Sequence, residues 1–198
     1  MAIITTELVK DLRQATGAGV LDCKRALEAK NGDFDKAVEY LREKGLAAAA
    51  KRSGRTANDG TIGVYVHHGS RVAAMVELNC ETDFVARTQE FQTLAHDLAM
   101  QVAAAKPQYL TRKDVPPELI EAEKNEYRAQ MAGQNKPEHI LDRIVEGKLE
   151  KFYRDTCILE QSFIKDEDLT VEDLIKSAIA KTGENIVLSR FVRYEIGE

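Results

Sequence analysis

The chain has 198 residues, a length that fits one medium domain, or a small domain followed by a medium one. Hydrophobic residues make up 43% and charged residues 31%, a mixture that excludes a disordered chain. A formal net charge of −5 and the absence of Trp argue against direct nucleic-acid binding, because phosphate-binding surfaces are basic and single strands stack on aromatic rings.

The cysteines and the N-terminus indicate a reducing compartment. Cys23, Cys80 and Cys157 are far apart and form no C-x-x-C pair, so the sequence predicts no zinc site, redox motif or disulfide framework. The N-terminus shows no basic stretch followed by an apolar run, and no apolar run approaches the ~20 residues of a membrane span. We therefore expect a cytoplasmic protein without membrane contact.

Helical spacing of apolar residues occurs three times within residues 1–54, separated by breaks at residues 16–19 and 31–32. Asp33 is a suitable N-cap for the third helix, and Gly45 lies where its C′ residue belongs. The three apolar stripes consist of Leu8, Val9, Leu12, Ala15, Val20, Cys23, Ala26, Leu27, Phe34, Ala37, Val38 and Leu41. Because helices this short are not stable alone, the sequence predicts one shared core. A basic linker and a turn-rich segment follow, and we expect a domain boundary after residue 54.

Within residues 55–198 the period changes to two. One run alternates Ile62, Val64 and Val66 with Gly63, Tyr65 and His67. A turn at Gly69-Ser70 precedes a second alternating run over residues 72–78, so the pattern predicts a β-hairpin with one buried face. Asp83 is a candidate N-cap for a helix that leads through Phe91 and ends near Lys106-Pro107.

The remaining sequence predicts three more helices and a strand. An exposed helix is expected between Pro116-Pro117 and a break at residues 133–137, and a long helix from Pro137 through Phe152. Residues 170–173 resemble a capping box at the start of another helix, and residues 186–196 predict a third strand. Together these elements predict an α+β fold, in which helices pack on a three-stranded sheet.

Catalytic and cofactor motifs are not found. There is no Walker motif, and Gly17-Ala18-Gly19 is followed by Asp22 where a dinucleotide fingerprint needs its third glycine. The histidines are His67, His68, His96 and His139, and no two of them have the spacing of metal ligands on one face. We expect no cofactor and no catalytic chemistry.

Four segments resemble the elongation factor Ts family. They are residues 8–27 (LVKDLRQATGAGVLDCKRAL) with Asn31-Gly32-Asp33 after them, residues 77–86 (ELNCETDFVA), Glu160-Gln161-Ser162-Phe163 and Gly183-Glu184-Asn185-Ile186. The resemblance implies a three-helix ubiquitin-associated-like module before a core whose three strands are antiparallel. It also implies guanine nucleotide exchange on elongation factor Tu during polypeptide elongation, with residues 55–198 serving dimerisation and contact with the GTPase. Since the length allows only one copy of the core, we expect a homodimer.

The same resemblance implies roles for particular residues. Thr82, Asp83, Phe84 and Val85 would dislocate Mg²⁺ from the GTPase, with Phe84 wedged between two of its helices. Residues that would dock the GTP-binding domain are Arg13, Val20, Leu21, Lys24 and Arg52.

Alternative interpretations remain at this point. Phe84 could pack under its own hairpin, Val20 and Leu21 could belong to the core, and Arg52 could be a helix-end charge beside Lys51. An adaptor that binds ubiquitin-like ligands would explain the first helices but leave residues 82–85 without a role. A small enzyme is a third class, for which a bound metal or substrate turnover would be needed.

Overall fold

The computed structural model describes residues 4–131 and 137–197. They divide into two compact units, each built from separate stretches of the chain. The first unit contains the described part of Met1–Thr61, with Leu78–Thr93 and Asp173–Val187. The second contains Ile62–Glu77, the described part of Leu94–Glu172, and Leu188 onward. The expected boundary after residue 54 falls inside the first unit, and a division into domains of residues 1–54 and 55–198 stays a prediction.

The first unit begins with the three expected helices, α1 (Thr6–Thr16), α2 (Val20–Ala29) and α3 (Phe34–Arg52). Thr5 caps α1 by accepting a hydrogen bond from the N–H of Leu8 at 3.2 Å. Asp33 caps α3, as predicted, and accepts from the N–H of Lys36 at 3.1 Å. The helices share one core, made of Val9, Leu12, Cys23, Ala26, Leu27, Ala37 and Leu41.

The prediction that the third helix ends at Gly45 is wrong, because α3 continues through the alanine-rich residues 46–50 to Arg52. A Cβ placed on Gly45 would lie 3.1 Å from the Cβ of Ala180 in α8 (Val171–Thr182), and both residues belong to the first unit. The glycine therefore allows two helices to approach closely rather than ending one of them. Lys51 and Arg52 lie in the last turn of α3, where cations interact favourably with the helix dipole.

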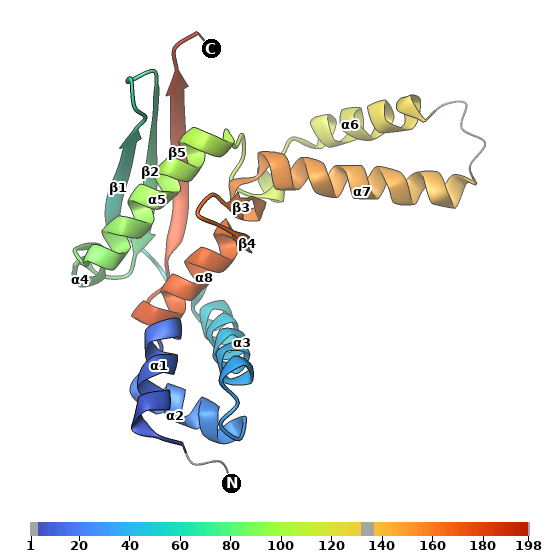
Figure 1. Cartoon of the computed structure of the whole chain (residues 1–198). Helices are drawn as coiled ribbons and strands as arrows, with labels where there is room; N and C mark the ends of the chain where they lie inside the picture. Colours follow the sequence, from blue (N-terminus) through green and yellow to red (C-terminus); the bar gives the residue numbers. More distant parts are fainter. Residues whose placement is uncertain (1–3, 132–136, 198) are drawn as a thin grey trace. The chain divides into compact units, whose positions relative to one another are not determined.

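The predicted three-stranded antiparallel sheet is present (Figure 1). It consists of β1 (Asp59–Val66), β2 (Val72–Cys80) and β5 (Val187–Glu195), in the order β1-β2-β5. The N–H of His67 donates to the carbonyl of Val72 at 2.8 Å across the β1–β2 turn. At the other edge of β2, the N–H of Ile196 donates to the carbonyl of Arg71 at 2.9 Å, so the end of β5 lies beside the start of β2. The fold class is α+β, as expected.

Helix α5 (Gln89–Ala105) covers one face of this sheet (Figure 1). On β1 the side that faces α5 carries Gly63, and a Cβ there would lie only 2.2 Å from the carbonyl oxygen of Ala95. Ile62, Val64 and Val66 lie on the opposite face and are 55%, 47% and 54% exposed. The hairpin does have one buried face, but the apolar side chains of β1 are not on it.

Five further helical segments and a small hairpin complete the described chain. They are α4 (Asp83–Ala86), the 3-10 helices η1 (Arg112–Asp114) and η2 (Ile158–Glu160), the helices α6 (Pro117–Gln130) and α7 (Glu138–Thr156), and the strands β3 (Ser162–Phe163) and β4 (Asp166–Thr170). Helices α6 and α7 lie side by side and antiparallel (Figure 1). The predicted break between them at residues 133–137 lies outside the described residues, apart from Pro137. The sequence did not indicate the antiparallel β3–β4 pair.

Candidate functional site

Residues 82–85 follow directly from the end of β2. Thr82 has an extended backbone, with φ −133° and ψ 154°, and its hydroxyl accepts a hydrogen bond from the N–H of Val85 at 3.4 Å. Thr82 is therefore the N-cap of α4, and the prediction that Asp83 caps the helix is wrong by one position. Asp83 occupies the first helical position, where its negative charge still favours the positive end of the helix dipole.

The single helix predicted from Asp83 through Phe91 is two helices. α4 has only four residues, and Thr88 starts α5 by accepting from the N–H of Phe91 at 3.3 Å. The hydroxyl of Thr88 also donates to the carbonyl of Val85 at 2.8 Å, which links the two helices. A four-residue helix is not stable by itself, so α4 depends on contacts with the surrounding chain. Ala86 of α4 is only 6% exposed, so this residue packs against the surrounding chain.

Phe84 projects from the first turn of α4 into solvent. Its side chain is 82% exposed, the highest value among the exposed large hydrophobic residues of the described chain. The alternative in which Phe84 packs under its own hairpin is therefore excluded. Asp83 forms an ion pair with Arg87 at 2.9 Å, and both side chains are well exposed. A surface pair of this kind contributes little stability, so Asp83 can exchange it for another partner at small cost.

The inner side of this loop is hydrogen-bonded to residues that follow α8. The N–H of Thr82 donates to a carboxylate oxygen of Glu184 at 3.1 Å, and the N–H of Asn185 donates to Glu81 at 2.6 Å. The segment containing Glu184 and Asn185 resembles the family, but the resemblance implied no role for it. No local pattern could do so, because the paired residues are 102 and 104 positions apart.

Cys80 lies immediately before the loop and is fully buried. Its thiol donates to the carbonyl of Thr82 at 3.2 Å. Burial, reinforced by the negative charge of Glu184, raises the pKa of the Cys80 thiol. A thiol of raised pKa is a poor nucleophile, so Cys80 serves packing and not reactivity.

The N-terminal candidates surround the turn between α1 and α2. Gly17 ends α1 with φ +68°, a left-handed conformation that favours glycine. Val20 and Leu21 begin α2 and are 50% and 68% exposed, which excludes the alternative that they belong to the core. Arg13 in the last turn of α1 and Lys24 in α2 are also exposed.

Arg52 differs from the other basic candidates. It is half-buried, and its Nε has no hydrogen-bond partner within the part of the chain that the structure describes. All of the candidate residues, from Arg13 to Val85, belong to the first compact unit.

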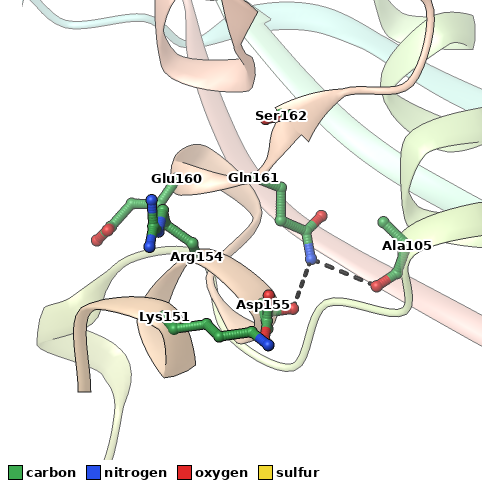
Figure 2. A pocket seen from close by; sticks show the side chains of 7 residues that line it. All are labelled: Ala105, Lys151, Arg154, Asp155, Glu160, Gln161 and Ser162. Carbon is green, nitrogen blue, oxygen red and sulfur yellow. Dashed lines mark hydrogen bonds between the residues drawn. The ribbon is translucent and has the colours of Figure 1, made fainter. Parts of the chain in front are cut away.

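The second unit contains a cavity of about 630 Å³ that none of these candidates lines (Figure 2). Its lining residues are Ala105, Lys151, Arg154, Asp155, Glu160, Gln161 and Ser162. The amide of Gln161 donates to the carbonyl of Asp155 at 2.9 Å and to that of Ala105 at 3.4 Å, so Gln161 holds two chain segments together. Among residues 4–131 and 137–197, no three His, Cys, Asp or Glu side chains are grouped as metal ligands.

Comparison with known proteins decides between the remaining interpretations. The family model described as elongation factor TS matches residues 25–198. The chain belongs to the elongation factor Ts family. It is 57% identical to elongation factor Ts of Carboxydothermus hydrogenoformans over 196 residues, which cover 99% of this chain and 90% of the relative. The corresponding protein of Moorella thermoacetica is 57% identical over 190 residues, covering 96% and 94%.

Family membership assigns the activity. Members of the elongation factor Ts family are nucleotide exchange factors for elongation factor Tu and not enzymes, and this chain is one of them. Elongation factor Ts of Syntrophus aciditrophicus, 54% identical over 195 residues, is covered over 97% of its length. This relative is therefore of nearly the same length as the present chain. In the described residues, no helix has the length and apolar character required to cross a bilayer.

Proposed function

We propose that the loop of residues 82–85 opens the nucleotide site of elongation factor Tu. A translation GTPase holds GDP through a phosphate-binding loop and a Mg²⁺ ion that bridges protein and phosphate oxygens. An exchange factor must bind the nucleotide-free state more tightly than the nucleotide-bound state, since only differential affinity shifts that equilibrium. The coupling is reciprocal, so the rebinding of GTP expels the exchange factor.

The observation that carries this proposal is the exposure of Phe84. Its ring is 82% exposed in the free chain and projects from the capped first turn of α4, so it can enter a partner without prior rearrangement. Burial of a phenylalanine contributes about 1.5–3 kcal/mol, and each tenfold gain in release rate requires about 1.4 kcal/mol. Insertion of Phe84 between two helices of the GTPase thus supplies one to two orders of magnitude.

Asp83 acts beside Phe84. Mg²⁺ binds oxygen ligands and demands strict octahedral geometry, so a carboxylate brought next to the ion competes with its existing ligands. The exposed Arg87 pairs with Asp83 in the free chain and would release it on binding. Thr82 and Val85 maintain the shape of the turn through the hydrogen bond between them.

The three-helix module of residues 1–54 docks the GTP-binding domain in this proposal. Val20 and Leu21 form an exposed apolar pair at the start of α2, a surface that gains from burial against a partner. Arg13, Lys24 and Arg52 supply basic groups for acidic residues of the GTPase. The action takes place in the cytoplasm and requires no cofactor, nucleic acid or membrane.

The test is release of fluorescent GDP from purified elongation factor Tu in a stopped-flow instrument. Phe84→Ala should lower the maximal release rate roughly tenfold or more, with unchanged circular dichroism. Ile164→Ala, which truncates another exposed apolar side chain at 37% exposure, is the matched control and should match wild type. Release by Phe84→Ala within about twofold of wild type would remove the ring from the mechanism.

A second copy of this chain is the proposed partner of the uncovered sheet face. Ile62, Val64 and Val66 of β1, Met75 of β2 and Tyr194 of β5 belong to the second unit and are between 42% and 67% exposed. A sheet with one apolar face open to solvent can be completed by packing against a second sheet, and within residues 4–131 and 137–197 the other sheet is only the two-stranded β3–β4 pair, so a second copy is the suitable source. The core of residues 55–198 would thus supply the dimer interface.

Sedimentation velocity at several concentrations tests the dimer. The wild-type chain should sediment as a concentration-dependent dimer, and Val64→Lys should sediment as a monomer, because a buried unpaired charge opposes association. Ser189→Lys, which adds the same charge at an exposed position elsewhere on β5, serves as the control. A wild-type monomer at all concentrations would contradict the proposal.

A further inference from the structure

Glu184 makes three hydrogen bonds to Glu81 and Thr82, at the start of the loop of residues 82–85. One carboxylate oxygen accepts the backbone N–H groups of Glu81 and Thr82, each at 3.1 Å. The other accepts the hydroxyl of Thr82 at 2.6 Å. A carboxylate that accepts several donors in this way forms charge-assisted bonds, which are shorter and stronger than neutral ones.

The residue after Glu184 returns the interaction. The N–H of Asn185 donates to the side chain of Glu81 at 2.6 Å, and its amide donates to the carbonyl of Arg55 at 2.7 Å. Asn185 is only 2% exposed, so its side of these bonds is shielded from water, and all three residues belong to the first unit. Each of the two chain segments thus holds a backbone N–H of the other with a carboxylate.

The chain direction at Glu184 is set by the end of α8. Gly183 has φ +78° and its N–H donates to the carbonyl of Ile179 at 2.9 Å, which closes the helix in the left-handed conformation. The N–H of Glu184 then donates to the hydroxyl of Thr182 at 3.3 Å. These contacts fix the backbone from which the carboxylate of Glu184 reaches the loop.

We infer that Glu184 is a positioning residue for nucleotide exchange, acting through Thr82 on Phe84. The hydroxyl of Thr82 donates to Glu184 and accepts from the N–H of Val85, so one group links the carboxylate to the first turn of α4. That helix is too short to persist alone, and Phe84 has few contacts of its own to fix its direction. Without Glu184 the turn would be ordered only on binding, and the entropic cost of ordering would oppose exchange.

This inference rests on the proposed role of Phe84, but its first test does not require elongation factor Tu. The chain contains no Trp, so Phe84→Trp introduces a single fluorescent reporter at the loop. Time-resolved anisotropy should show a restricted indole, and adding Glu184→Gln should roughly double the amplitude of its fast local motion. Glutamine keeps only one acceptor oxygen, which can serve either the two backbone N–H groups or the hydroxyl of Thr82 but not both as Glu184 does, and it removes the negative charge that strengthens these bonds. Glu39→Gln on the exposed face of α3 is the matched control.

The second test measures GDP release in a double-mutant cycle. Glu184→Gln should lower the maximal release rate roughly five- to tenfold in the wild-type background, and less than about twofold in the Phe84→Ala background. A role that is only structural would lower both rates by the same factor. Thr82→Val should reproduce the loss and Thr82→Ser should retain activity, which keeps the question answerable if Glu184→Gln fails to fold.

The outcomes separate the two proposals. Unchanged mobility of the indole on adding Glu184→Gln overturns the positioning role, whatever Phe84 does. Increased mobility with the same loss of exchange in both backgrounds also overturns it, because Glu184 would then act by another route. Full exchange by Phe84→Ala would instead refute the proposed function, while the anisotropy would still report whether Glu184 orders the loop.

Discussion

Gly63 in β1 and Ala95 in α5 are in backbone contact: a Cβ added to Gly63 would lie 2.2 Å from the carbonyl oxygen of Ala95 and 3.0 Å from its Cβ. No side chain can move to relieve such a clash. Gly63→Ala should therefore force strand and helix apart and lower the free energy of unfolding by about 2 kcal/mol. Urea denaturation measures this. Gly54→Ala, with nothing within 4 Å of the added Cβ, is the control, and equal midpoints for the two variants would contradict the argument.

Replacing Gly147 with alanine should change the free energy of unfolding in the opposite direction. It lies in the interior of α7, is exposed, and would meet nothing within 4 Å if it carried a Cβ. Glycine in a helix interior costs about 1 kcal/mol relative to alanine. Gly147→Ala should thus raise the free energy of unfolding by up to about 1 kcal/mol without altering exchange. A lower melting temperature for Gly147→Ala would contradict this prediction, because it would mean that the added methyl group meets a neighbour in solution.

Leu21 should affect docking and not the opening of the nucleotide site. It is 68% exposed at the start of α2, on a different element from Phe84. If its contact is equally strong before and during nucleotide release, Leu21→Ala raises the half-saturating concentration, by roughly tenfold, and leaves the maximal release rate unchanged. A titration of GDP release against exchange-factor concentration measures both, with Ile164→Ala as the control. A reduced maximal rate would instead place Leu21 in the opening step.

The stability of the folded chain should depend on pH through Glu195. Lys106, whose Nζ lies 2.6 Å from the carboxylate, and then Arg193 lower the pKa of Glu195 to about 2 from its ordinary 4.5. Because the pKa is lowered in the folded state, the stabilisation is complete above about pH 4.5 and is lost as the pH falls towards about 2. Glu195→Gln should melt below wild type at about pH 6, and the difference should shrink across that window. The exposed Glu167→Gln should show no such trend.

Local patterns predicted the elements well where packing agreed with propensity. Asp33 caps its helix as its position indicated, and the period-two runs became β1 and β2. Gly45 shows the limit of a local signal: glycine often ends a helix, but here it permits contact with Ala180, which lies far away in the sequence, in α8. Only the folded chain reveals such a reason for glycine.

Alternation predicts that a strand has two faces, but it does not say which face a helix will cover. On β1 the covered face is the one with Gly63, because a residue without a side chain lets α5 approach. Ile62, Val64 and Val66 lie on the other face and remain exposed. The resemblance proposes residues 82–85 as the site, and this stays a prediction, whereas no pattern in the sequence pointed to Glu184. Its hydrogen bonds join segments 102 or more positions apart, and a carboxylate on its own carries no sign of its partner.

The distance in sequence between Glu81-Thr82 and Glu184-Asn185 has a consequence for biosynthesis. The carboxylate that anchors the loop is added to the growing polypeptide 102 residues after Thr82. A nascent chain that ends before residue 184 therefore contains Phe84 but lacks the carboxylate of Glu184 that holds the start of the loop. In the proposed mechanism, the loop can therefore be held by Glu184 only after synthesis has passed residue 184.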